Sequence, residues 1–142
     1  MTLLSEESQQ ALREQLKRHE GVVYKVYLCS QGKPTIGVGR NLEDLGINDD
    51  EAMFLMDNDI DRTEQELSRN IPYLAELNEV RISVLINMNF NLGITRLLKF
   101  VKMFEALEQH DYDTAAEEML DSLWASQVGN RAIELSEMMK KG

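Results

Sequence analysis

The fold is decided by residues 19–40, which read HEGVVYKVYLCSQGKPTIGVGR. Glu20 stands where a helix should end, because a glycine follows it. The β-branched and aromatic residues at 22–27 are typical of a strand, and residues 32–34 supply turn chemistry. Residues 36–39 then predict a second short strand. We therefore expect a small hairpin that folds back beside one glutamate.

A helix is predicted before this hairpin, over residues 5–20, with Ser5 as its N-cap. Leu12 and Leu16 repeat at the spacing of an apolar stripe, and Glu20 continues that spacing. A carboxylate would thus lie on the apolar face, where leucine is the ordinary residue. The alternative interpretation is a solvated surface glutamate, which is the usual state of a glutamate in the last turn of a helix.

Helical periodicity continues through the rest of the chain. Helices are predicted over residues 48–70, 79–92, 96–109, a stretch that starts at Asp111 or Asp113, and 130–140. The pattern Asn48-x-x-Glu51 resembles a capping box at the start of the first of these. Residues 79–92 are apolar on most sides, which indicates a buried central helix.

These elements predict an α+β fold that is mainly α, with a small β-hairpin lobe and a larger helical lobe flanking a cleft. We expect one domain over residues 1–142. Its small lobe would span about 20–60, and its helical lobe about 73–142 together with the N-terminal helix. Glu20, Cys29 and Thr35 would face the cleft from three different elements.

Composition excludes several classes of function. The 142 residues include 25 acidic and 15 basic side chains, so the net charge is -10 at pH 7. This balance argues against nucleic-acid binding and against attraction to anionic membrane surfaces. No stretch approaches the ~18 apolar residues of a membrane span, so no stable membrane insertion is expected. No cluster has metal-ligand spacing, so neither a metal nor another cofactor is expected.

The sequence resembles the phage-type lysozymes, the endolysins of tailed phages and prophages that form glycoside hydrolase family 24. The resemblance rests on Glu20, Cys29 and Thr35, which match the family's spacing of glutamate, aspartate or cysteine, and threonine. Three further stretches support it: TIGVGR at 35–40, NMNFNLG at 87–93 and GNR at 129–131. The match covers roughly residues 8–139. It implies a lysozyme-like fold.

The family cleaves the β-1,4 bond between N-acetylmuramic acid and N-acetylglucosamine in peptidoglycan. Such hydrolysis needs an acid at the leaving oxygen and a group that positions water or stabilises an oxocarbenium-like transition state. The resemblance implies Glu20 as general acid, Thr35 as the residue that holds the attacking water, and inversion at the sugar. Cys29 takes the place of the usual aspartate, and its thiolate could serve if the thiol pKa were lowered.

The resemblance also implies residues that bind the substrate. Phe90, Asn91 and Gly93 would face the sugar, and Arg131 would reach Glu20 and hold its carboxylate. Phe90 could instead belong to the core, and Arg131 could be a solvated surface residue.

An ion pair is implied as well, between Arg40 of the hairpin and Asp59 of the linking helix. Its role would be structural, since a surface pair contributes only ~0–1 kcal/mol.

The implied partner is peptidoglycan, acted on by a monomer. The first residues lack the pattern of a signal peptide. We therefore expect the protein to wait in the host cytoplasm until a holin opens the membrane, and then to reach the periplasm and cell wall at lysis.

Three alternatives to a muramidase stay open. Cys29 and the acidic balance favour a catalytically weak or silent module of lysozyme fold that binds peptidoglycan or regulates other proteins. A purely structural helical protein would make the spacing of Glu20, Cys29 and Thr35 a coincidence. Cys29 could also act as a papain-like nucleophile with His19 as its base, although no third residue would orient that base.

Overall fold

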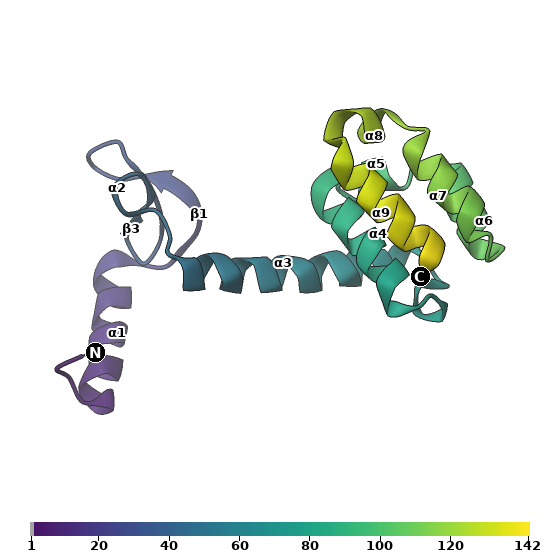
Figure 1. Cartoon of the computed structure of the whole chain (residues 1–142). Helices are drawn as coiled ribbons and strands as arrows, with labels where there is room; N and C mark the ends of the chain where they lie inside the picture. Colours follow the sequence, from purple (N-terminus) through teal and green to yellow (C-terminus); the bar gives the residue numbers. More distant parts are fainter. Residues whose placement is uncertain (1) are drawn as a thin grey trace. The chain divides into compact units, whose positions relative to one another are not determined.

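The structure is a computed structural model that describes residues 2–142, and the chain divides into two compact units (Figure 1). The first unit ends at Met53, and the second covers Phe54–Gly142. Helices dominate, and one small antiparallel sheet of three strands accompanies them. This confirms the predicted mainly α class of α+β fold. The single domain over 1–142, with the N-terminal helix counted in the helical lobe, stays a prediction.

Helix α1, Glu6–Glu20, opens the first unit and has the predicted limits. The hydroxyl of Ser5 caps its start by accepting a hydrogen bond from the backbone N–H of Ser8 at 3.1 Å. Gly21 ends it with a positive φ of 75° and donates its N–H to the carbonyl of Lys17. Local sequence signals were therefore enough to set both ends of this helix.

The side chains of α1 are exposed within their own unit. No residue of this helix is buried, and Leu12 and Leu16 keep 40% and 43% of their surface exposed. Glu20 is exposed as well. The first unit alone therefore does not bury the apolar stripe that the sequence predicts.

Three short strands follow, with the order β1-β2-β3. Their bounds are Val23–Leu28 for β1, Pro34–Gly37 for β2 and Arg40–Asn41 for β3. Residue Tyr27 lies opposite Thr35, and the ladder is irregular between Val23 and Tyr27. The hairpin is thus observed with strands shifted by one or two residues from their predicted limits. Strand β3 and the short helix α2, Leu42–Leu45, were not predicted.

The predicted capping box opens helix α3, Asp49–Asn70. The Asn48 side chain accepts a hydrogen bond from the Glu51 N–H at 2.8 Å, and Glu51 Oε1 accepts one from the Asn48 N–H at 3.0 Å. Each residue thus satisfies a donor that the start of a helix leaves unpaired, and the prediction is confirmed.

Arg40 uses the same glutamate. Its guanidinium lies 2.8 Å from Glu51 Oε2 and donates to the Gly46 carbonyl at 3.1 Å, and this pairing lowers the pKa of Glu51. The predicted pairing of Arg40 with Asp59 would join the two units and stays a prediction, while Asp59 pairs with Arg62 on its own helix. The capping box already holds Glu51 in place, so its carboxylate is in position to accept hydrogen bonds from the Arg40 guanidinium.

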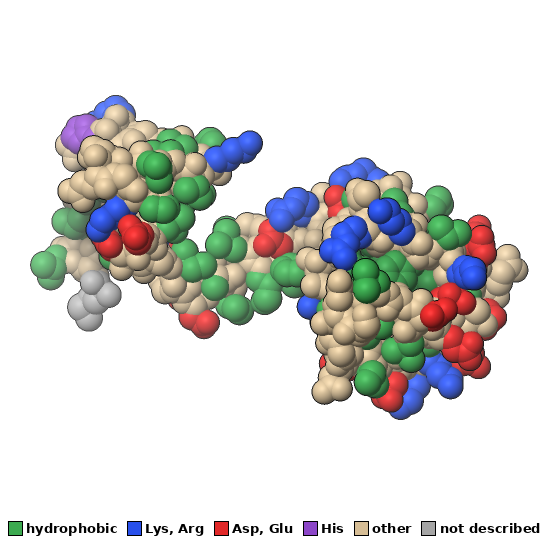
Figure 2. Space-filling view, turned by 90° about the horizontal axis from the view of Figure 1, so that it is seen from above, with side chains coloured by type: hydrophobic (Ala, Val, Ile, Leu, Met, Phe, Trp, Pro, Cys, Tyr) green, Lys and Arg blue, Asp and Glu red, His purple; other side chains and the backbone are tan. Residues whose placement is uncertain are grey.

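The second unit is a compact set of helices that includes the rest of α3. Its further elements are η1 (Leu74–Glu76), α4 (Glu79–Leu92), α5 (Ile94–Leu97), α6 (Val101–Glu108), α7 (Tyr112–Leu120), α8 (Leu123–Val128) and α9 (Asn130–Lys141). Figure 1 shows α9 between α4 and α7, and both pack against it. Val84, Leu85 and Met88 of α4 are fully buried, which confirms the predicted central helix. Acidic and basic side chains are interspersed over the visible face of this unit (Figure 2).

The predicted helix over residues 96–109 is wrong as one continuous element. Helix α5 ends at Leu97 and α6 begins at Val101. Between them Phe100 leaves the helical conformation with φ -77° and ψ 56°, and its N–H bonds to Leu97 in a tight turn. Apolar residues recur at helical spacing on both sides of this break, so periodicity alone does not reveal it.

A buried arginine, Arg81, joins α4 to the end of α9. It is 8% exposed, and it donates to the carbonyls of Met139 at 2.7 Å and Lys140 at 3.0 Å. Its guanidinium carbon also lies 3.4 Å from the ring centroid of Tyr112. The guanidinium of Arg81 thus supplies charged donors to two carbonyls that the end of α9 leaves unpaired. No helix in residues 2–142 is long and apolar enough to cross a bilayer.

Candidate functional site

Glu20 rests on the hairpin at one glycine. Gly39 lies in the turn between β2 and β3 with φ 70°, and a Cβ atom built there would stand 2.9 Å from Glu20 Oε2. That separation is too short for any real side chain, so the carboxylate occupies the place that a larger residue would fill. The end of α1 and the hairpin therefore meet at the carboxylate of Glu20.

Cys29 and Thr35 lie together at the other turn of the hairpin. Cys29 is half-buried and directly follows β1, and its N–H donates to the carbonyl of Lys33 at 3.0 Å. Thr35, in β2, is only 3% exposed, and its hydroxyl donates to the same carbonyl at 2.9 Å. Both side chains are thus positioned by the backbone of one tight turn.

This turn also favours the ionised form of the cysteine. Hydrogen bonding from the backbone of Lys33, and then from that of Gln31, lowers the pKa of the Cys29 thiol, while partial burial opposes the shift. A thiolate at this position can carry negative charge, as a carboxylate would.

The structure gives each of the three predicted catalytic residues a neighbour in the hairpin. Glu20 meets Gly39, and Cys29 meets Thr35. No hydrogen bond within residues 2–142 joins Glu20 to Cys29 or Thr35. All three belong to the first unit.

In the second unit, the residues predicted to face sugar lie at the end of α4. Phe90 is 48% exposed and lies outside the core of the second unit. The side-chain oxygen Oδ1 of Asn91 accepts a hydrogen bond from Trp124 Nε1 at 2.8 Å, which orients this side chain. Gly93 ends the helix with φ 82° and has open space where a side chain would stand.

Arg131 is held within the second unit by Asn87, a residue that sequence reasoning missed. Its Nε and one terminal nitrogen donate to Asn87 Oδ1 at 3.0 and 2.7 Å. Both residues line a cavity of about 340 Å³ that is otherwise mainly apolar and includes Phe90. The signal that could have revealed this role is the run of three asparagines at 87, 89 and 91 in an apolar helix.

Asn89, the middle member of this run, was also missed. It is 3% exposed and donates through Nδ2 to Glu66 Oε1 at 3.0 Å. Its Oδ1 is buried without a hydrogen-bond partner within residues 2–142. It lines a polar hollow of about 250 Å³ beside Phe90. A buried acceptor of this kind is satisfied only by a donor from water or a ligand.

No group of three or more His, Cys, Asp or Glu side chains in residues 2–142 is arranged to hold a metal ion.

Comparison with known proteins gives a consistent result. A family model described as phage lysozyme matches residues 17–140. The chain is 26% identical over 160 residues to the pre-baseplate central spike protein Gp5 of Enterobacteria phage T4, covering 93% of this chain but 28% of that protein. It is 25% identical over 162 residues to probable T4-type lysozyme 1 of Dictyostelium discoideum, covering 93% of this chain and 95% of that protein. For probable T4-type lysozyme 2 of the same organism the identity is 23% with the same coverage.

Proposed function

Because the chain belongs to the phage lysozyme family, we propose that it hydrolyses the β-1,4 bond between N-acetylmuramic acid and N-acetylglucosamine in peptidoglycan. Family membership supports a peptidoglycan-lytic role in general. The observation that carries the finer proposal is the Glu20 carboxylate seated on Gly39, in the same hairpin unit as Cys29 and Thr35.

Glu20 acts as the general acid in this proposal. Its carboxyl gives a proton to the glycosidic oxygen as the bond to the sugar breaks. The group is exposed in the first unit, so a bound glycan would take the place of the water around it. The contact with Gly39 restricts the position of the Glu20 carboxylate, and therefore the point at which its proton is delivered.

Thr35 and Cys29 position the attacking water. The Thr35 hydroxyl donates its proton to the Lys33 carbonyl. The oxygen of the hydroxyl can therefore accept a hydrogen bond from water. The Cys29 thiolate accepts a hydrogen bond from the same water and offsets positive charge on the sugar, and it takes that proton as the water oxygen bonds to the anomeric carbon. Attack on the face opposite the leaving group then inverts the configuration at the anomeric carbon.

Substitution of Cys29 tests this role through pH dependence. Since the thiol pKa is lowered, the thiolate fraction rises as pH rises through that value, whereas Glu20 must stay protonated. Cys29→Asp is ionised already in weak acid, so its kcat optimum is expected at lower pH than that of the wild type. Cys29→Ser cannot ionise and is expected to lose about tenfold in kcat. Profiles of kcat against pH provide the measurement, and three superimposable profiles would contradict the assignment.

Gly39→Ala tests the seat of Glu20. The added methyl group would stand 2.9 Å from Glu20 Oε2 on a backbone with φ 70°, so the carboxylate must move and the turn is strained. We expect kcat to fall about 10²-fold and unfolding free energy to fall by about 1–2 kcal/mol. Gly46→Ala is the matched control, because Gly46 also has positive φ, has no atom within 4 Å of the added Cβ, and lies outside the turn that positions Cys29 and Thr35. Equal kcat values for the two variants would contradict the role of Gly39.

The proposed bond is tested by the sugar at the new reducing end. Purified peptidoglycan is digested, reduced with borohydride and examined by mass spectrometry. The proposal expects reduced N-acetylmuramic acid at the new ends. Reduced N-acetylglucosamine, or release of peptides alone, would overturn it.

Host lysis is the biological role that we attach to this chemistry, with a monomer released from the cytoplasm through a holin pore. Support comes from family membership alone. Bacteria that express the chain should lyse only when a holin or another membrane-permeabilising agent is supplied. Lysis that starts without such an agent would contradict this route.

One alternative has a specific observation in its favour. Cys29 replaces the usual aspartate and Glu20 is exposed, which suits a catalytically silent module that only binds peptidoglycan. Binding of purified glycan without any release of reducing ends would favour this alternative.

A further inference from the structure

The polar hollow of about 250 Å³ that contains Asn89 lies between helices α3 and α4 of the second unit. Six side chains of these two helices line it: Asp59, Arg62, Thr63, Glu66, Asn89 and Phe90. Among them Asn89 is 3% exposed, and its Oδ1 atom has no hydrogen-bond partner within residues 2–142. The hollow therefore contains a buried acceptor that this part of the chain leaves unsatisfied.

The Asn89 amide is held in one orientation. Its Nδ2 atom donates to Glu66 Oε1 at 3.0 Å and to the Thr63 carbonyl at 3.5 Å. Both partners are acceptors, so an exchange of the amide nitrogen and oxygen would place three oxygen atoms together. The Oδ1 atom is therefore satisfied only by a hydrogen-bond donor that enters the hollow.

The charges of the hollow favour a donor that is also positive. Arg62 pairs with Asp59 on its own helix, whereas Glu66 takes part in no ion pair within residues 2–142. One negative charge is thus left uncompensated beside the unsatisfied oxygen. Water or a neutral amide supplies a donor without charge, but an ammonium group supplies both.

The size of the hollow and its aromatic edge favour an organic cation over a single metal ion. The hollow has room for more than one water molecule. Phe90, at its edge, is 48% exposed. The face of an aromatic ring attracts an ammonium group, and methylene groups pack against the same ring.

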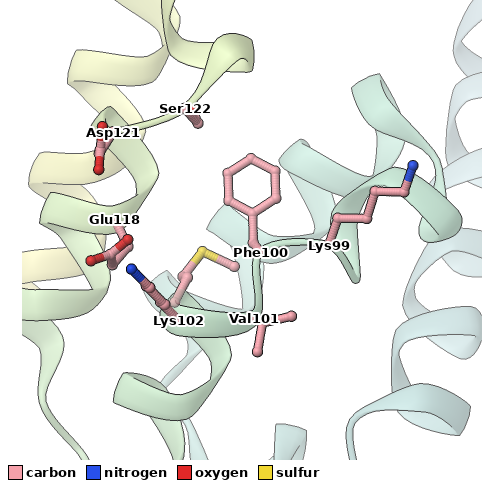
Figure 3. Close-up of a pocket in the computed structure, with 8 residues that line it drawn as sticks. Lys99, Phe100, Val101, Lys102, Glu118, Asp121 and Ser122 are labelled. Carbon is pink, nitrogen blue, oxygen red and sulfur yellow. The ribbon is translucent and has the colours of Figure 1, made fainter.

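A larger cavity in the same unit, of about 390 Å³, lacks such an acceptor. It lies between the α5–α6 connection and the end of α7, beside the ring of Phe100 (Figure 3). The Lys102 amine turns toward Glu118 there. Within the described residues, no buried side-chain nitrogen or oxygen of its lining is without a partner. The smaller hollow is therefore the better candidate for a ligand site.

We propose that the hollow between α3 and α4 binds a small aliphatic primary amine in its ammonium form. One N–H of the ammonium group donates to Asn89 Oδ1 and another to the Glu66 carboxylate, while the carbon chain lies along the Phe90 ring. An occupied hollow stabilises the second unit, because the amine binds the folded pair of helices. The site uses none of the proposed catalytic residues, so it goes beyond the proposed hydrolysis.

Titration of the full chain with n-butylamine at neutral pH, followed by NMR, tests the proposal. The side-chain NH₂ signals of Asn89, identified by their absence in Asn89→Leu, report binding at the hollow. Butyltrimethylammonium is the matched probe, because it has the same charge and chain but no N–H. We expect it to bind about tenfold more weakly. Equal affinities, or no saturable shift with n-butylamine as expected when water alone fills the hollow, would overturn the proposal.

Variants locate the binding in this hollow. Glu66→Gln keeps an oxygen for Asn89 but removes the negative charge, so it is expected to weaken n-butylamine binding about tenfold. Glu64→Gln makes the same change in net charge at an exposed position of the same helix and should have no effect. If both variants weaken binding equally, overall charge is responsible and the proposal fails.

Asn89→Leu separates ligand binding from a purely structural role. Without amine its melting temperature should not fall, because the substitution removes the unsatisfied oxygen. Added n-butylamine should raise the melting temperature of the wild type, followed by Trp124 fluorescence, and leave that of the variant unchanged. An equal rise in both proteins would contradict the site.

Two further probes identify the source of the ammonium group. The first is 1,4-diaminobutane, a free amine, and the second is Nα-acetyl-lysine methylamide, which presents a lysine side chain as a protein does. Tighter binding of the diamine assigns the hollow to a free amine, and tighter binding of the lysine derivative assigns it to a protein side chain. Failure of both to compete with n-butylamine would contradict a primary-amine site.

Discussion

Glu20→Gln is expected to reduce the release of reducing ends from purified peptidoglycan by about 10²–10⁴-fold. The amide has nearly the shape of the carboxyl group and can still rest on Gly39, but it has no acidic proton to give to the glycosidic oxygen. Helix α1 buries no residue within its own unit, so the loss of one carboxylate there should not disturb the fold. Activity and stability should therefore separate cleanly in this variant.

The measurement pairs initial rates with a urea unfolding curve for each protein. Glu7→Gln is the matched control, since Glu7 is also exposed and on the same helix, but lies at its other end. The control should keep the wild-type rate. Retained turnover in Glu20→Gln would remove the general acid from the mechanism and leave the peptidoglycan-binding alternative.

Arg81→Met is expected to give the largest loss of stability, about 3 kcal/mol of unfolding free energy, because two charge-assisted hydrogen bonds disappear. The carbonyls of Met139 and Lys140 would lose their donors, and the ring of Tyr112 would lose the guanidinium beside it. Methionine fills much of the space of the arginine stem, so the effect reports the polar contacts rather than a cavity.

Chemical denaturation measures this loss, with Arg96→Met as the control. Arg96 is exposed and its side chain makes no hydrogen bond within residues 2–142, so its replacement should change stability by less than about 0.5 kcal/mol. Similar stabilities of the two variants would show that Arg81 contributes little. Loss of the cooperative transition in Arg81→Met alone would show a contribution larger than expected.

The parts of the fold that depend on local signals could be predicted from the sequence. Ser5 and Gly21 set the ends of α1, and the apolar run of residues 79–92 gave the limits of α4. The break at Phe100 could not be predicted, because no proline or glycine marks it and its aromatic contact, Trp124, lies far along the chain. The buried position of Arg81 could not be predicted, since its carbonyl partners lie 58 and 59 residues away in the sequence.

In the candidate site as well, local contacts could be predicted from the sequence and distant contacts could not. The hairpin placed Cys29 beside Thr35 because both belong to one tight turn, which spacing in the sequence can anticipate. The role of Gly39 as the seat of Glu20 could not be predicted, since it depends on how the end of α1 meets the β2–β3 turn. The partner of Arg131 was missed for a similar reason, as Asn87 lies 44 residues away.

The contact of Trp124 with Asn91 has a practical consequence for unfolding experiments. Trp124 is the chain's single tryptophan, it is 3% exposed, and it belongs to the second unit. Its intrinsic fluorescence therefore monitors the melting of the helical unit alone, whereas far-ultraviolet circular dichroism averages over the whole backbone. Coincident melting curves from the two signals would mean that both units unfold as one cooperative body, and separated curves would assign a stability to each.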